Sequence, residues 1–254
     1  MNIKEQQEYR AQLNRLITGL PSSPAPRAFS ASTRRGLPNA LNNDVGVAMD
    51  HEILAVQRGL SDEHMRAIDV STYLASLVAS SKHSKEEKAW QDAYFEVLKE
   101  VGWTIWAAAN IYRYTLPTDT SVDMIAQVIL RDIRCEAAEP ALMRSMASVH
   151  KTPRAFSLFR SDGQSSHREG MFRLIPVPST LAHNHMMLGA IFIQIDKLDE
   201  NGLIGLLPAR SPAYDRVGGG FSVRLNLNKL DMMLQIVEPA LREARERLWE
   251  QIRQ

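Results

Sequence analysis

The sequence predicts one α+β domain, with a helical N-terminal half packed on a mainly antiparallel sheet and a long C-terminal helix. Before about residue 150, most apolar residues recur at helical spacing. After His150, apolar and β-branched runs alternate with polar loops, a pattern typical of antiparallel strands. The end of the chain carries a single apolar stripe at helical spacing. Helices and strands that are segregated along the chain in this way define the α+β class.

Residues 1–46 are expected to form an N-terminal helix followed by a flexible linker. Apolar side chains from Ile3 to Leu20 lie at roughly helical spacing. The segment that begins at Pro21 is rich in Pro, Ser and Arg and contains no acidic residue. Such a composition cannot bury enough apolar area to offset the entropy of ordering it. The single α+β domain is therefore expected to span residues 47–254.

Three helices are expected at the start of that domain. The first covers Asp50–Arg58 and would end at Gly59, the usual residue at a left-handed helix terminus. Ser61 can cap the second helix through its hydroxyl. Ser84 and Glu87 have the spacing of a capping box, which opens the third helix.

The pattern changes after Gly102. Residues 103–114 are aromatic and β-branched, which favours a long strand. We expect this strand to join the later sheet, so that both halves of the chain share one core. Thr120 or Ser121 can cap a further helix, and Pro140 is placed to begin another.

The C-terminal part is expected to contain five strands and a closing helix. Asn228 would cap that helix, and Pro239 should kink it. The triplet Gly218–Gly220 is expected in a loop over 208–220, as a turn that leads into the last strand. The expected strands are RAFSLFR (154–160), MFRLIPV (171–177), MMLGAIFIQI (186–195), LIGLLPA (203–209) and FSVRLNL (221–227).

Composition restricts the function classes. The 30 basic and 29 acidic side chains give a formal charge of +1, which gives no general electrostatic argument for binding nucleic acid or an anionic membrane. The balanced net charge does not exclude a local basic patch on the surface. Cys135 is the only cysteine, so an intramolecular disulfide and a cysteine-based zinc site are excluded.

Localisation follows by default from missing signals. The N-terminus lacks the apolar core of a signal peptide, and no run of about 18 apolar residues is present. A cytoplasmic protein is expected, while export without a cleaved signal and association with a membrane surface stay open. No cofactor is predicted.

Residues Asp69–Trp103 resemble part of a little-characterised group of bacterial and fungal α+β proteins. The shared features are a helix that ends in an apolar run, a charged link, and a Trp/Tyr-bearing helix that ends in Gly-Trp. The order of elements up to LNLN at 225–228 is also similar. These motifs consist mostly of packing and capping residues, and the resemblance covers about 69–240.

The chain also resembles the Erwinia virulence factor proteins, which are α/β proteins implicated in bacterial colonisation of insect guts. This resemblance implies a non-enzymatic host-interaction or virulence-associated protein whose partner is a membrane or a host factor. It further implies a fatty acyl thioester, such as palmitate, on a cysteine. Cys135 is the candidate position for lipid attachment, although it lies in no local motif that matches that cysteine.

Cys135 has two other interpretations. Arg131 and Arg134 could lower the pKa of the thiol and activate it as a thiolate. Alternatively the side chain simply packs in the core, because cysteine is among the most frequently buried residues. Packing is the favoured interpretation.

His183 and His185 would lie on one face of a strand and could bind a metal ion. An enzyme with a site near this pair and the 208–220 loop is therefore an alternative function. The sequence contains no G-x-S-x-G, H-E-x-x-H, Walker or dinucleotide-binding motif. We therefore lean toward a protein that is not an enzyme.

A second alternative is DNA binding through residues 51–68, whose residue spacing is similar to that of a helix-turn-helix. Asp62 and Glu63 at the start of the second helix would repel phosphate. A plain corner between two helices is the favoured interpretation.

Aromatic residues gather around the Gly-Trp junction. Helical spacing favours Trp90 and Tyr94 as core residues. The face that includes Trp106, Tyr112 and Tyr114 could instead form a ligand-facing or lipid-facing surface. The C-terminal helix could also form a contact between copies of the chain, although its charged positions equally fit a solvated face.

Overall fold

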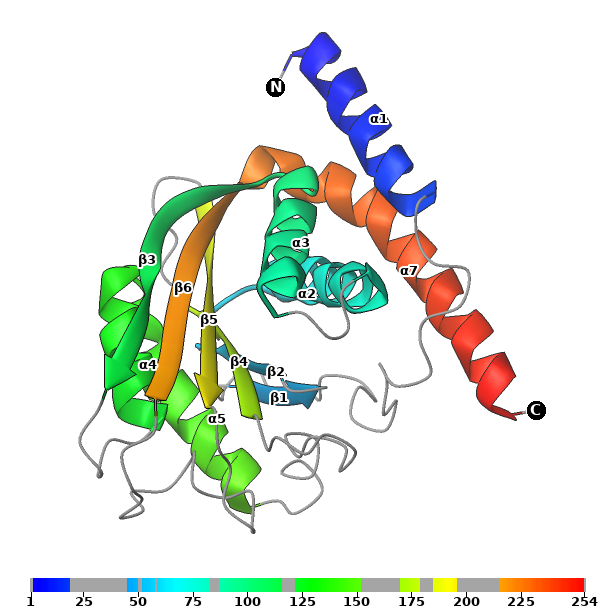
Figure 1. Ribbon diagram of the computed structural model, residues 1–254. Coiled ribbons are helices and arrows are strands. Elements are labelled where there is room, and N and C mark those ends of the chain that lie inside the picture. The colour runs from blue at the N-terminus through cyan, green and yellow to red at the C-terminus, as the bar shows by residue number, and fades with distance from the viewer. Residues whose placement is uncertain are drawn as a thin grey trace.

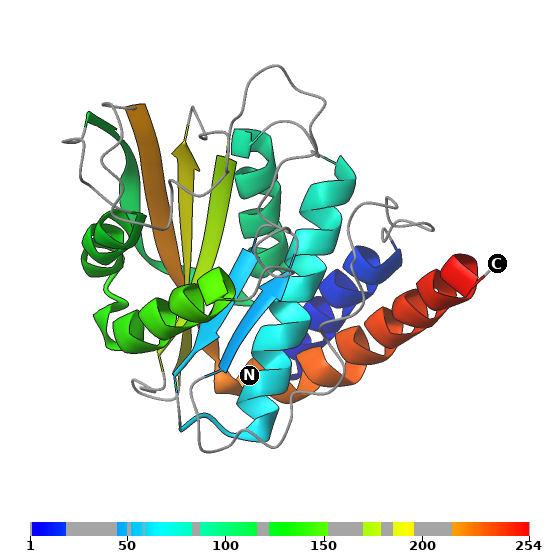
Figure 2. The same cartoon turned by 90° about the horizontal axis from the view of Figure 1, so that it is seen from below.

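A sheet of six described strands lies between two layers of helices (Figures 1 and 2). The structure is a computed structural model that describes residues 2–18, 45–49, 52–57, 59–82, 87–115, 122–151, 170–178, 185–195 and 215–253. The strands are β1 (Val45–Met49), β2 (Glu52–Val56), β3 (Trp103–Thr115), β4 (Gly170–Val177), β5 (His185–Ile195) and β6 (Asp215–Asn226). The α-helices are α1 (Ile3–Thr18), α2 (Asp62–Lys82), α3 (Glu87–Glu100), α4 (Val122–Asp132), α5 (Glu139–Lys151) and α7 (Leu230–Arg253).

The strand order is β1-β2-β4-β5-β6-β3. Only the pair β2–β4 is parallel among these strands, and the other four pairs are antiparallel. The predicted α+β class, with a mainly antiparallel sheet and a long C-terminal helix, is confirmed. β3 pairs with β6, which also confirms that the strand after Gly102 joins the C-terminal part of the chain to the N-terminal part.

The two faces of the sheet pack against different helices (Figure 2). Helices α2, α3 and α7 lie on one side, and α4 and α5 lie on the other. In β5, Leu188 and Phe192 belong to the core beneath α2, α3 and α7. Met187 and Ile191 belong to the core beneath α4 and α5. Successive side chains of a strand point to opposite faces, so a strand buried on both sides must be apolar throughout. This confirms that β5 is a central strand.

The predicted helix over Asp50–Arg58 is wrong, because this segment contains β2. Ile53 and Ala55 pack in the core beneath α4 and α5, while Leu54 and Val56 pack in the core beneath α2 and α3. That alternation is the two-residue period of a strand.

The turn after β2 keeps its expected glycine. Gly59 has a φ of 101°, but it follows a strand and not a helix. The predicted helix-turn-helix over 51–68 is therefore a strand followed by α2. It lacks the first helix of a DNA-binding corner, and that function is withdrawn.

The predicted start of α2 at Ser61 is confirmed, whereas the other expected capping residues Ser84, Thr120 and Ser121 lie outside the described residues. The amide N–H of His64 donates to the Ser61 hydroxyl at 3.3 Å, as expected for the cap of α2. At the other end of the chain, Asn226 and not Asn228 supplies the cap, because its side chain accepts from the Asn228 N–H at 2.9 Å. A short 3-10 helix, Leu227–Lys229, separates this cap from α7.

Helix α1 lies beside α7 and reaches the end of α3 (Figure 1). The Tyr9 hydroxyl donates to the carbonyl oxygen of Val101 at 2.7 Å, and Leu13 is fully buried. Burial raises the pKa of Tyr9. Several expected features lie outside the described residues. They are the linker before Val45, the strands 154–160 and 203–209, and the side chains of Tyr112 and Tyr114. The domain division near residue 46 stays a prediction.

The glycine triplet lies within β6, so the predicted loop over 208–220 is wrong for residues 215–220. Gly220 faces Ile129 of α4. A Cβ at this position would lie 2.6 Å from the carbonyl oxygen of Ala190 and 2.9 Å from Cγ2 of Ile129. The absence of a side chain therefore lets α4 pack directly on β5 and β6.

We predict that Gly220→Ala destabilises the protein by about 1–3 kcal/mol, because the added methyl group overpacks a rigid contact with backbone. Urea unfolding measures this change. Ala108→Gly, at an exposed position opposite Phe221 on the neighbouring strand, is the control and should cost less than about 1 kcal/mol. Equal stability of Gly220→Ala and the natural protein would contradict the prediction.

Candidate functional site

An exposed tryptophan and two arginines meet where β3 passes the end of α4. Trp106 is placed there by a β-bulge. Ile105 pairs with Val223 and Ala107 pairs with Ser222, so Trp106 is an extra residue with no partner of its own on β6. A bulge bends the strand and changes the direction of a side chain. Trp106 is 41% exposed as a result, although its neighbour Trp103 is buried.

Arg224 comes from the strand that pairs with the bulge. Its residue lies two positions from Ser222 on β6, so both side chains are on the same face of the sheet. The Ser222 hydroxyl donates to the carbonyl oxygen of Ile133 at 2.6 Å, which identifies this as the α4 face. The Arg224 guanidinium carbon lies 3.0 Å from the centre of the Trp106 ring, in a cation–π contact.

Arg134 reaches the same ring from the turn that ends α4. The Cys135 N–H donates to the carbonyl of Leu130 at 2.8 Å, and the Arg134 N–H donates to the carbonyl of Arg131 at 3.0 Å. These two bonds define a Schellman motif with Arg134 at its left-handed position. Arg134 has a φ of 59°, which usually requires glycine or asparagine. Its guanidinium carbon lies 5.8 Å from the centre of the Trp106 ring.

The two arginines lie close enough to repel each other. Burial lowers the pKa of Arg224, and the positive charge of Arg134 lowers it further. The Nε atom of Arg224 is buried and has no hydrogen-bond partner. Within the part of the chain that the structure describes, neither arginine forms an ion pair with a carboxylate. Two cations are thus held near one ring, and no carboxylate of the described residues lies within ion-pair distance of either guanidinium group.

Apolar side chains are exposed on the same two elements. Ile105 is 55% exposed, but it pairs with Val223, whose side chain packs in the core beneath α2 and α3, so Ile105 lies on the other face of the sheet. Met124 and Val128, one turn apart on α4, are 52% and 44% exposed. We define the β3–α4 surface as Trp106, Met124, Val128, Arg134 and Arg224. This surface combines exposed apolar side chains with two cations.

Cys135 occupies the residue after Arg134 and points inward. In a Schellman motif this position commonly packs against the residue that accepts its hydrogen bond, here Leu130, and both side chains are buried in one core. The Sγ atom lies 3.1 Å from the position that a Cβ on Gly189 would occupy. The favoured packing interpretation of Cys135 fits this position.

The electrostatic environment of Cys135 keeps the thiol protonated. Burial, and secondarily the charge of Glu136, raise its pKa to about 12, while a hydrogen bond with Ser222 acts in the other direction. An activated thiolate needs a lowered pKa. The proposed activation by Arg131 and Arg134 is therefore opposed, and Arg134 points to Trp106 instead.

The structure places only one of the two candidate histidines. His185 is the first residue of β5, half-buried and paired with Asn226, whereas His183 lies outside the described residues. Among the residues that are described, no group of three or more His, Cys, Asp or Glu side chains could hold a metal ion. The metal site at His183 and His185 stays a prediction.

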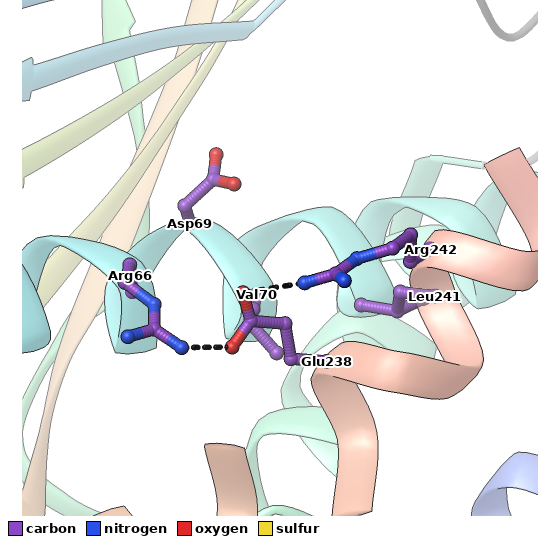
Figure 3. A pocket seen from close by; sticks show the side chains of 6 residues that line it. All are labelled: Arg66, Asp69, Val70, Glu238, Leu241 and Arg242. Carbon is purple, nitrogen blue, oxygen red and sulfur yellow. Dashed lines mark hydrogen bonds and ion pairs between the residues drawn. The ribbon is translucent and has the colours of Figure 1, made fainter. Parts of the chain in front are cut away.

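A small cleft of about 90 Å³ lies between α2 and α7 (Figure 3). Glu238 accepts from Arg66 at 2.5 Å and lies 3.8 Å from Arg242, while Asp69 points away from it. Glu238 raises the pKa of Arg66. Because the charges in this cleft largely cancel, we interpret it as a contact that joins two helices and not as a ligand site.

Comparisons with known proteins give only distant structural similarity. No protein-family model and no curated protein sequence matches the chain. A delta-endotoxin is similar with a TM-score of 0.43 at 9% identity, over 69% of this chain and 80% of that chain. The activated Cyt2Ba monomer from Bacillus thuringiensis subsp. israelensis gives 0.46 at 10%, over 69% and 97%.

The Evf virulence factor is also similar, with a TM-score of 0.35 at 8% identity, over 93% of this chain and 88% of that chain. The weak resemblance to the Erwinia virulence factor type, predicted from the sequence, is thus confirmed as a weak structural one. At these values the likeness supports no conclusion about activity. In the described part of the chain, no helix is long and apolar enough to cross a membrane.

Sequence patterns identified part of the β3–α4 surface. They marked Trp106 as a member of an aromatic face, and the structure exposes it. Arg224 and the role of Arg134 were missed, because strand register and a left-handed turn bring them to the ring. Met124 and Val128 carried a usable signal, since both are apolar residues outside the buried stripe of α4 formed by Ile125, Ile129 and Ile133.

We predict that Arg134→Gly stabilises the protein by about 0.5–1 kcal/mol. Glycine removes the left-handed strain, and its larger entropy in the unfolded chain offsets part of this gain. The midpoint of thermal unfolding should rise by about 1–4 °C. Arg131→Gly, placed in the last helical turn, should lower stability by about 0.5–1 kcal/mol. A lower midpoint for Arg134→Gly would show that Arg134 stabilises the turn.

Proposed function

We propose that the chain is a non-enzymatic, virulence-associated protein that acts at a membrane surface. The observation that carries this proposal is the β3–α4 surface, where an exposed tryptophan contacts two arginines and two apolar side chains are exposed on the adjoining helix α4. Soluble proteins rarely leave such groups together at one place unless something binds there. The virulence context rests on the resemblance of the chain to the Erwinia virulence factor proteins.

The composition of this surface suits the boundary between lipid and water. Tryptophan is enriched at that boundary because its ring is apolar and its N–H is polar. Arginine can keep its charge among the headgroups while its stem lies against apolar atoms. Met124 and Val128 would add apolar area to the contact, and the protein would lie on the membrane without crossing it.

Membrane association through this surface does not depend on a large positive net charge of the chain. The formal charge of +1 would give little attraction to a membrane at long range. The contact would instead depend on the local arrangement of Trp106, Arg134 and Arg224, and on the apolar residues beside them. Binding should therefore be weak and reversible in the absence of a second membrane anchor.

We predict that the purified protein sediments with phospholipid vesicles and that Trp106→Ala reduces the partition coefficient by about tenfold, the factor expected for loss of one interfacial aromatic side chain. Ile3→Ala is the matched control, because Ile3 is 75% exposed on α1, away from the β3–α4 surface. Ile3→Ala should bind like the natural protein. Circular dichroism checks that both variants are folded.

Two results would contradict this proposal. One is that the natural protein stays in the supernatant with every vesicle composition. The other is that Ile3→Ala and Trp106→Ala reduce binding equally, which would mean that any exposed apolar residue contributes.

The fatty acyl group on Cys135 is a separate proposal that rests on the resemblance. Since the thiol is buried against Gly189, an acyl chain there would need the turn after α4 to move away from β5, or would have to be accommodated in the core. We predict that protein from its native host gains the mass of one acyl chain and that hydroxylamine removes it. The Cys135→Ser variant should lack this adduct. An unmodified mass in expressing cells would refute acylation.

A further inference from the structure

Trp106, Arg134 and Arg224 form a cluster in which neither arginine makes an ion pair with a carboxylate of the described residues. The guanidinium carbons of Arg224 and Arg134 lie 3.0 and 5.8 Å from the centre of the same ring. Two like charges held this close to one ring repel each other, and the lowered pKa of Arg224 has this repulsion as one of its causes. An anion between the two guanidinium groups would remove that repulsion.

The turn geometry adds a second observation. Arg134 stands at a left-handed position where glycine would fit without strain. The backbone therefore gains nothing from an arginine at this place. What the arginine does supply is a second guanidinium group at the Trp106 ring. Local strain of this kind is a reason to look for a binding role.

We propose that Arg134 and Arg224 bind the phosphate of an anionic phospholipid headgroup, with Trp106 beside it at the lipid–water boundary. This inference rests on the membrane association proposed above and names the ligand of the same surface. Planar guanidinium groups donate pairs of hydrogen bonds to phosphate oxygens, and arginine keeps its charge when partly desolvated.

The surroundings favour a lipid over a soluble phosphate compound or a nucleic acid. Met124 and Val128 are exposed on α4, next to the turn that carries Arg134, and apolar side chains would gain nothing from contact with a nucleic-acid backbone. The turn also carries two exposed acids, Asp132 and Glu136, which would weaken attraction to a long polyanion. A single headgroup needs only the two arginines.

The test compares vesicles of phosphatidylcholine alone with vesicles that also contain phosphatidylglycerol. For the natural protein we expect tighter binding when phosphatidylglycerol is present. Arg134→Gln and Arg224→Gln should each reduce that gain by about fivefold, the usual effect of one basic residue near an anionic membrane. Arg224→Lys should restore part of the gain, because it keeps the charge but not the paired hydrogen bonds.

Arg131→Gln is the matched control for general attraction between charges. Arg131 is exposed on α4, one turn before Arg134, and within the described residues it forms no cation–π contact with the Trp106 ring. It should leave the gain nearly unchanged. Arg134→Gly provides a further variant that is expected to be fully folded, so loss of binding in it would not come from unfolding.

The outcomes separate this inference from the proposed function. If Trp106→Ala reduces binding to all vesicles while the arginine variants keep the phosphatidylglycerol gain, the headgroup site is refuted and membrane association stands. Equal effects of Arg131→Gln and Arg134→Gln would also refute a specific site. Release of the protein from vesicles by millimolar inorganic phosphate would point to a free phosphate ligand and overturn the lipid assignment. No binding to any vesicle would refute both proposals.

Discussion

The pairing of β3 with β6 is the constraint on which both the fold and the candidate site depend. β3 lies in the middle of the sequence, and β6 lies near its end, so their ladder joins the helical front to the C-terminal strands. The first residue of β3, Trp103, is buried and donates from its indole N–H to the Ser71 hydroxyl of α2 at 3.0 Å. Three residues later the bulge exposes Trp106. β3 thus carries both a buried tryptophan of the core, Trp103, and an exposed tryptophan of the candidate site, Trp106.

The close packing of α4 on the sheet fixes the position of Arg134, because Arg134 lies in the turn that ends this helix. Gly220 and Gly189 let the helix and its final turn approach β5 and β6, and the Ser222 hydroxyl satisfies a carbonyl at the end of the helix. The turn that follows is a Schellman motif whose two adjacent residues have opposite roles. Arg134 points to the surface, and Cys135 points into the core. The position of the thiol is therefore explained by helix termination alone.

The distribution of charge matters more here than its sum. Glu238 pairs with both Arg66 and Arg242 in the cleft between α2 and α7, so these charges serve to join two helices. In contrast, Arg134 and Arg224 contact an aromatic ring and form no ion pair within the described residues. A net charge near zero conceals this difference, which is why composition gave no argument for a membrane and the local arrangement does.

The sequence alone determined the fold class, most helices and the burial of Trp90 and Tyr94, because these follow from local spacing and capping. It failed at Asp50–Arg58, where a short apolar run fits a buried strand and a helix equally well, and only pairing with β1 and β4 decided between them. It also placed Gly220 in a loop, since its role depends on a helix that packs from elsewhere in the chain. The β3–α4 surface was decided by tertiary structure. Strand register brings Arg224 to Trp106, and a left-handed turn brings Arg134, and neither is encoded in the spacing of the residues themselves.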